Sequence, residues 1–115
     1  MIKVEDLRVG NYLLDGYGEI FQVKQIGTGL IESHGMHIYE IEEIKPIELT
    51  EEILLKSEFL NWNGYYSKGD IKYEEENIIL NFWSDDSYVI RSIKYLHQLQ
   101  NLYFMLCNEE LKINL

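Results

Sequence analysis

The segment from Tyr95 to Glu109 limits the fold more than any other part of the sequence. It contains neither Gly nor Pro, and its large apolar residues recur with the period of an α-helix. One arc of such a helix collects the residues that we expect in the core: Leu96, Leu99, Leu102, Tyr103, Leu106 and Cys107. The sequence therefore predicts a long amphipathic helix against which other elements must pack.

The polar side of this predicted helix is built from amides and a histidine. Between Lys94 and Glu109 no residue carries a formal charge unless His97 is protonated, although 26% of the chain is charged. Amides suit a helix face that is partly shielded from water and must still form hydrogen bonds. Two interpretations stay open: the amides hold neighbouring loop backbones, or the face is a ligand pocket or partner surface. The second would use His97, Gln100, Asn101 and Phe104.

The first half of the chain has the pattern of short strands separated by glycine turns. Apolar and polar residues alternate from Glu19 to Ile26, the period of a half-buried strand. We expect further strands at residues 12–15, 30–33 and 37–44. Four short strands rich in β-branched and aromatic residues predict a small SH3-like β-barrel over residues 1–49.

The second half begins with a helix signal and returns to strands. Thr50 is a good N-cap and is followed by Glu51 and Glu52, which predicts a connecting helix over residues 50–60. Three β-rich runs at 65–73, 77–83 and 87–93 predict an antiparallel meander, and 111–115 a short closing strand. The predicted fold is α+β in a single domain, 1–115, in which residues 61–115 form a meander packed by the C-terminal helix.

The charge of the chain argues against several classes of partner. Twenty acidic residues stand against ten basic ones, a formal net charge of −10. Such a surface repels phosphate backbones, so direct nucleic-acid binding and anionic-membrane binding are disfavoured. The acidity serves solubility, or it imitates a polyanion and occupies a nucleic-acid-binding protein. No long apolar run and no signal-like segment is present, so we expect a cytoplasmic protein.

Candidate catalytic and metal groups are weak in this sequence. Cys107 is the only cysteine, and its apolar neighbours predict a buried, unreactive thiol. His34 and His37 are three residues apart without a nearby cysteine, which is typical of surface histidines. No nucleophile elbow or phosphate loop is found. We therefore expect no enzyme, no cofactor and no metal.

Aromatic residues give a second candidate site. Trp62, Tyr65 and Trp83 occur in the loop-and-meander half of the chain, where an exposed ring would stack on a base or anchor a partner. Arg91 precedes the C-terminal helix and is the natural partner of an anionic group. Ordinary strand packing is the alternative for the rings.

Three segments carry a resemblance to other proteins. They are residues 7–12 (LRVGNY), 46–52 (PIELTEE) and 93–104 (IKYLHQLQNLYF), with NEEL following at 108–111. In this order they resemble a family of small uncharacterised proteins encoded in bacterial genomes and in phages or prophages. Residues 56–59 (KSEF) depart from the glycine-containing turn of that family, which bears on where the preceding helix ends. The phage connection implies a counter-defence role, such as sequestering a nucleotide signal or blocking a host nuclease.

The sequence thus favours recognition over catalysis. Our leading expectation is a non-enzymatic protein that binds or sequesters a small polar, nucleotide-derived ligand to counter host defence. The ligand would meet Trp62, Tyr65, Trp83, Arg91, His97, Gln100, Asn101 and Phe104. One alternative is an acidic inhibitor or adaptor that mimics nucleic acid and blocks a host protein, and another is a structural interaction domain. A homo-oligomer is a further expectation, since a second subunit would complete an uncharged helix face.

Overall fold

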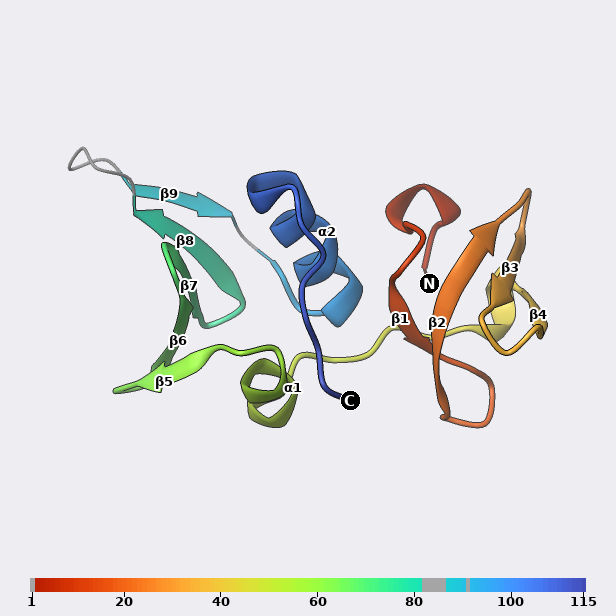
Figure 1. Ribbon diagram of the computed structural model, residues 1–115, viewed down its shortest axis with the longest axis horizontal. Coiled ribbons are helices and arrows are strands. Elements are labelled where there is room, and N and C mark those ends of the chain that lie inside the picture. The colour runs from red at the N-terminus through yellow and green to blue at the C-terminus, as the bar shows by residue number, and fades with distance from the viewer. Residues whose placement is uncertain (1, 82–86, 91) are drawn as a thin grey trace. The chain divides into compact units, whose positions relative to one another are not determined.

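The computed structural model describes residues 2–81, 87–90 and 92–115 and shows an α+β chain, which confirms the predicted class (Figure 1). Its contacts divide the chain into two compact units. Unit 1 comprises Met1–Glu48 and Tyr95–Glu110, and unit 2 comprises Leu49–Lys94 and Leu111–Leu115. Residues 49–94 of unit 2 are therefore inserted into the sequence of unit 1, and residues 111–115 follow it. That residues 1–115 form a single domain stays a prediction.

Unit 1 is built on a curled antiparallel sheet with the strand order β1-β2-β3-β4 (Figure 1). The strands are β1 (Tyr12–Leu14), β2 (Ile20–Ile26), β3 (Leu30–Ser33) and β4 (Ile38–Glu40). Two short 3-10 helices, η1 (Val4–Asp6) and η2 (Ile41–Glu43), flank them. The last predicted strand is shorter than expected because residues 41–43 turn into η2, where alternation of apolar and polar residues has already been lost.

The curl of this sheet comes from β2. Its first part pairs with β1 and its second part with β3, and the register shifts between Val23 and Gln25. An irregularity of this kind bends the strand and increases its twist. The concave side holds a core of Ile2, Leu13, Val23, Ile31 and Ile44. The alternation seen in the sequence of β2 thus does select the buried residue Val23.

The C-terminal helix α2 (Leu96–Cys107) belongs to unit 1. The sequence grouped this helix with the meander of residues 61–94, but its contacts place it with β1 instead. Leu96 and Leu99 are buried as expected. The helix begins with a capping box, in which the Tyr95 N–H donates to Gln98 Oε1. It ends at Asn108, whose left-handed backbone conformation stops the helix.

The last turn of α2 corrects two predictions. Leu106 and Cys107 were expected in the core, and the Cys107 thiol was expected to be buried, but both residues are exposed. The contacts of the N-terminal segment with the helix reach Phe104. The final turn continues beyond that point, so its apolar arc stays in solvent.

Unit 2 consists of a short helix and a five-stranded antiparallel meander in sequential order (Figure 1). Its elements are α1 (Glu51–Lys56), β5 (Leu60–Trp62), β6 (Tyr65–Lys68), β7 (Ile71–Glu74), β8 (Asn77–Asn81) and β9 (Ser87–Ile90). The expected helix over 50–60 ends earlier, because Glu58 adopts a positive φ of 68° and the chain turns into β5. The expected run 65–73 is two strands joined at Gly69 and Asp70.

A core of its own holds unit 2 together. The buried residues are Leu54, Phe59, Ile71, Tyr73, Ile78, Leu80, Ile93 and Leu111. The Tyr73 hydroxyl donates to the Ile93 carbonyl at 2.9 Å, so this ring fixes the end of the meander. Residues 111–115 do not form the expected closing strand. They are held instead by burial of Leu111 and by the Asn114 N–H, which donates to the Lys56 carbonyl.

The cap of α1 gives the first prediction. The Thr50 hydroxyl oxygen accepts from the Ile53 N–H at 3.2 Å, which satisfies a backbone donor that the helix cannot pair. We expect Thr50→Ala to lower the free energy of unfolding by about 1 kcal/mol, measured by urea denaturation. Thr50→Ser keeps the acceptor and serves as the control. Equal stability of Thr50→Ala and the wild type would show that this cap contributes nothing.

Candidate functional site

The polar side of α2 binds the backbone of the segment that precedes β1. Gln100 Nε2 donates to the Gly10 carbonyl at 3.0 Å, and Gln100 Oε1 accepts from the Tyr12 N–H at 2.9 Å. One residue further along the helix, Asn101 Nδ2 donates to the Asp6 carbonyl at 2.9 Å. A side-chain amide offers one acceptor and two donors, and here it replaces the missing strand partner of an edge backbone. These contacts are the ones expected if the amides hold neighbouring loop backbones, which is the first of the two interpretations of this face.

Asn11 completes this arrangement from the other side. Its Nδ2 donates to Asn101 Oδ1 at 2.8 Å, and its Oδ1 accepts from the Arg8 N–H at 2.7 Å. Asn11 is fully buried, and Gln100 is 1% exposed. Buried amides of this kind are stabilising only when each group is paired. We call Asn11, Gln100 and Asn101 the amide clamp.

An ion pair lies at the exposed end of the contact between α2 and the segment that precedes β1. The Arg8 guanidinium donates to both carboxylate oxygens of Glu110, and it lies 4.3 Å from the centre of the Phe104 ring. The hydrogen bond from Arg8 lowers the pKa of the Glu110 carboxyl below its usual range. Gly10 has a φ of +101°, and a Cβ there would lie 3.6 Å from the Glu110 carboxylate. That distance is an ordinary van der Waals contact, so glycine suits the position because of its backbone conformation.

His97 lies one turn before the amide clamp on the same helix. Its side chain is buried, and its ring stacks on Tyr95 at 6.0 Å with 10° between the planes. Within the described part of the chain, its Nδ1 has no hydrogen-bond partner. Burial lowers the pKa of His97 below its usual value, although the Asp6 carboxylate opposes the shift. The imidazole is thus held in its neutral form at neutral pH.

The predicted site residues do not form one constellation. His97, Gln100, Asn101 and Phe104 lie along α2 in unit 1 and face the N-terminal segment. Trp62 and Tyr65 lie in unit 2, directly opposite each other on β5 and β6. Trp83 and Arg91 lie outside the described residues. The amides of Gln100 and Asn101 are engaged within the chain, whereas Trp62 is 54% exposed.

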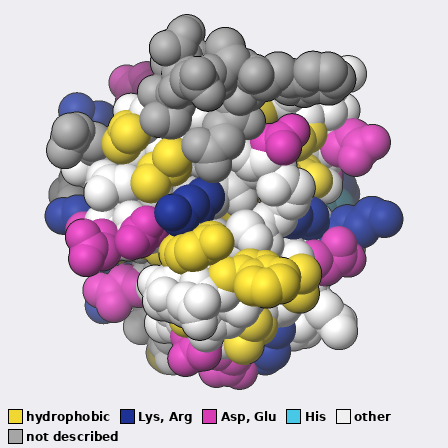
Figure 2. All heavy atoms as spheres, turned by 90° about the vertical axis from the view of Figure 1, so that its left-hand side faces the viewer, with side chains coloured by type: hydrophobic (Ala, Val, Ile, Leu, Met, Phe, Trp, Pro, Cys, Tyr) yellow, Lys and Arg dark blue, Asp and Glu magenta, His cyan; other side chains and the backbone are white. Residues whose placement is uncertain are grey.

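The hairpin of β5 and β6 borders a groove of about 450 Å³. It is lined by Trp62, Tyr65, Ser67, Gly69, Asp70, Ile71 and Lys72. The Lys72 ammonium lies 4.0 Å from the centre of the Tyr65 ring and 3.3 Å from a Glu74 carboxylate oxygen. The side of the molecule that carries the meander in Figure 1 shows hydrophobic side chains gathered beside a basic one, with acidic side chains around them (Figure 2). We call this site the hairpin groove.

A second groove, of about 710 Å³, lies in unit 1 and was not predicted from the sequence. It is lined by Asp15, Gly16, Tyr17, Glu19, His37, Tyr39, Glu42, Glu43 and Lys45. The bridge between Leu14 and Lys45 brings the β1–β2 turn beside η2, so two acidic segments meet. Burial, followed by Asp15, Glu19 and Glu43, raises the pKa of Tyr39. Tyr17 is 95% exposed at the rim. We call this site the acidic groove.

The acids of this groove come from separate parts of the sequence. Nothing in the local pattern around Glu42 and Glu43 shows that they face the turn after β1. Asp15 is 7% exposed, and its carboxylate accepts hydrogen bonds from the N–H groups of Tyr17 and Glu19 at 2.8 and 3.0 Å. The available signal was an aspartate close to two glycines. An aspartate at such a position often stabilises a turn, because its carboxylate accepts hydrogen bonds from the backbone of that turn.

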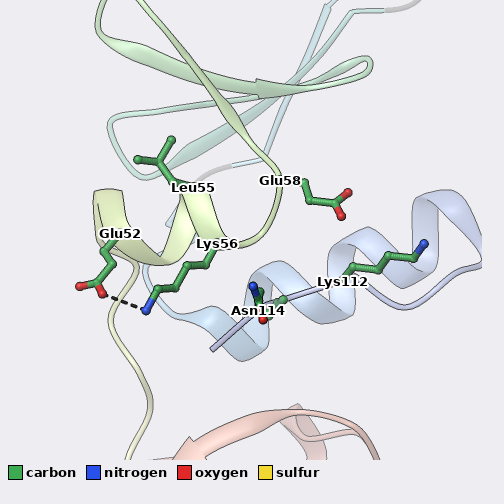
Figure 3. A pocket seen from close by; sticks show the side chains of 7 residues that line it. Glu52, Leu55, Lys56, Glu58, Lys112 and Asn114 are labelled. Atoms are coloured by element: carbon green, nitrogen blue, oxygen red, sulfur yellow. Dashed lines mark ion pairs between the residues drawn. The ribbon is translucent and has the colours of Figure 1, made fainter.

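A third hollow, of about 590 Å³, lies between α1 and the segment 112–114 of unit 2 (Figure 3). Leu55 and Ile113 are its apolar residues, and Lys56 pairs with Glu52 at 2.9 Å along one side. Glu58 and Lys112 bring one charge of each sign to the other side. Because the charges balance, the hollow has no preference for an anion or a cation.

Comparison of the chain with models of known protein families, with curated proteins and with solved structures found no match. Within the described residues, no helix is both long enough and apolar enough to span a membrane. The same residues contain no group of three or more His, Cys, Asp or Glu side chains placed to hold a metal ion. The assignment of function rests on the geometry of the grooves and the clamp.

The amide clamp gives the second prediction. Gln100→Leu keeps the volume of the side chain but leaves the partly buried Tyr12 N–H without the Gln100 acceptor. We expect it to lower the free energy of unfolding by about 2–3 kcal/mol, because each unpaired buried group costs about 1–3 kcal/mol. Urea denaturation followed by circular dichroism measures the loss. Gln25→Leu, on an exposed position of β2, is the matched control and should change stability by less than about 0.5 kcal/mol.

Proposed function

We propose that the chain is a non-enzymatic binding protein that takes up a small polar, nucleotide-derived ligand in the hairpin groove. One observation carries the proposal: Trp62, about half exposed, stands opposite Tyr65 in a groove that also contains Lys72. Exposed rings beside a cation are the arrangement that binds a planar base attached to an anionic group.

The physical contributions in this groove are separable. Stacking of a base on an aromatic side chain contributes about 1–3 kcal/mol and tolerates any base, since every base has a flat face. Lys72 supplies the positive charge, and Asp70 an acceptor for ribose hydroxyls or base amines. The carboxylate of Glu74 shares Lys72, so an anionic ligand must compete with it. These contributions sum to a moderate affinity, and they do not require a catalytic group.

The wider setting of this proposal comes from the sequence resemblance. A protein that withholds a nucleotide signal would counter a host defence, which fits relatives encoded by phages, and it would act in the cytoplasm. For unit 1 we propose an SH3-like barrel, because its four strands are short, sequential and bent at β2. In this proposal unit 1 supports the fold and unit 2 carries the ligand.

Trp62 gives the third prediction. A panel of mono-, di- and cyclic nucleotides should contain a member that raises the melting temperature and quenches tryptophan fluorescence. We expect Trp62→Ala to weaken that binding by about 5- to 150-fold, which corresponds to the loss of about 1–3 kcal/mol of stacking. Tyr17→Ala removes an even more exposed ring from unit 1 and should bind like the wild type. Binding that survives Trp62→Ala unchanged would place the ligand elsewhere.

A second candidate function rests on the acidic groove. Four carboxylates and two tyrosines line one depression of a chain whose net charge is −10. This surface would accept a lysine- or arginine-rich segment of a partner protein, as an inhibitor or adaptor that mimics nucleic acid would require. Tyr17 and Tyr39 offer faces for cation–π contacts with the same segment.

The acidic groove gives the fourth prediction. An oligolysine peptide should bind, and the affinity should fall as salt rises, measured by fluorescence anisotropy. Glu42→Gln combined with Glu43→Gln should weaken binding several-fold. The matched control is Glu75→Gln with Glu76→Gln, which removes the same charge from a turn of unit 2. If both pairs weaken binding equally, only the overall charge attracts the peptide and the groove is not a site.

A further inference from the structure

The side of α2 that faces the N-terminal segment contains one ionisable group that the clamp does not satisfy. His97 is 4% exposed, and its buried Nδ1 has no hydrogen-bond partner among the residues that the structure describes. Gln100 and Asn101 follow it by three and four residues, so all three side chains lie on one face of the helix. Asn101 in turn holds the Asp6 carbonyl. The histidine thus lies one turn before the amide clamp, at the end of the contact between α2 and the N-terminal segment.

Neutral and protonated imidazole differ in what they require at this position. The neutral ring can leave one nitrogen unpaired at moderate cost, and its flat face stacks on Tyr95. The imidazolium has two N–H donors and a full charge, both of which need partners when buried. At Nδ1 the structure provides none. Protonation therefore favours any conformation in which the ring reaches water.

One charge and one titratable ring act directly on His97. Asp6 of η1 is the acid that acts on it electrostatically, and this attraction is smaller than the cost of burial. The Tyr95 phenol ring stacks on the imidazole. Glu48 belongs to the segment that pairs with Tyr95, and it is exposed. The burial of the ring thus prevails over the nearby acid.

We propose that His97 is an acid-sensitive latch: its protonation releases the N-terminal segment from α2 by opening the amide clamp, while unit 2 stays folded. The opening is local because the bonds that fail are those between residues 6–12 and the helix. Release frees the amides of Gln100 and Asn101 and the backbone of residues 10–12 for other contacts. The latch is independent of the ligand proposed for the hairpin groove.

The sign of the pH dependence follows from the burial. The pKa of His97 is lowered in the folded chain, so the unfolded or opened form binds the proton first. The stability of the clamp is complete above the ordinary histidine value of about 6.5 and declines as the pH falls below it. The Arg8–Glu110 pair acts in a separate window, because the carboxyl pKa is also lowered and its contribution is lost only at more acidic pH.

Amide hydrogen exchange measured by NMR tests the latch in the full chain. The Tyr12 N–H, bound to Gln100, reports on the clamp, and the Ile93 N–H, bound to the Glu76 carbonyl, reports on unit 2. We expect the protection factor of Tyr12 to fall by up to tenfold per pH unit below about 6.5, because one proton is taken up on opening. The protection factor of Ile93 should stay constant over the same range.

Two variants and one titration decide the outcome. His97→Phe keeps a stacking ring without a titratable group and should make the protection of Tyr12 independent of pH. His34→Gln, at an exposed histidine, should behave like the wild type. The proton NMR titration of His97 in the wild type needs no variant. A pKa at or above about 6.5 in that titration, or an equal fall of protection in His97→Phe, would overturn the latch.

Discussion

Unit 1 depends on hydrogen bonds between two parts of the chain that lie about ninety residues apart. Asn11 reaches Asn101 at 2.8 Å, and Gln100 spans two backbone groups on either side of Asn11. These groups are buried, so leaving them unpaired would cost more than pairing them contributes. The helix cannot be replaced by another apolar helix, because the edge backbone before β1 needs donors and acceptors at set positions. That requirement explains why the polar side of α2 is made of amides.

The insertion of residues 49–94 brings its own two ends together. Unit 2 is a sequential meander, so its strands pair over short loops that cost little entropy. The Leu49 N–H donates to the Lys94 carbonyl, so the two ends of the insertion are adjacent. The Leu96 N–H donates to the Ile47 carbonyl within unit 1. The insertion thereby closes the long loop that the amide clamp would otherwise have to close alone.

The sequence predicted the elements whose signals are local. The helix period of α2, the cap at Thr50 and the alternation in β2 each correspond to observed structure. The Asn63–Gly64 pair is a strong hairpin signal and joins β5 to β6, but no strand at residues 60–62 was expected from the sequence. Leu106 and Cys107 were placed in the core because a helical wheel does not show where the neighbouring segment ends. The bond partners of Gln100 and the meeting of Glu42 with Asp15 are set by tertiary structure, and no local pattern contains them.

The resemblance markers gain a physical meaning from these contacts. The segment 7–12 is the one that the helix segment 93–104 binds, with Gly10 accepting from Gln100 and Asn11 donating to Asn101. The marker at 46–52 supplies the Ile47 carbonyl and the Thr50 cap, at the points where the chain passes between the units. Each of the three segments thus forms hydrogen bonds that stabilise the fold, and none of them lines the hairpin groove or the acidic groove. The residues that line the two grooves therefore lie in the parts of the chain between the three segments, at positions 13–45 and 53–92.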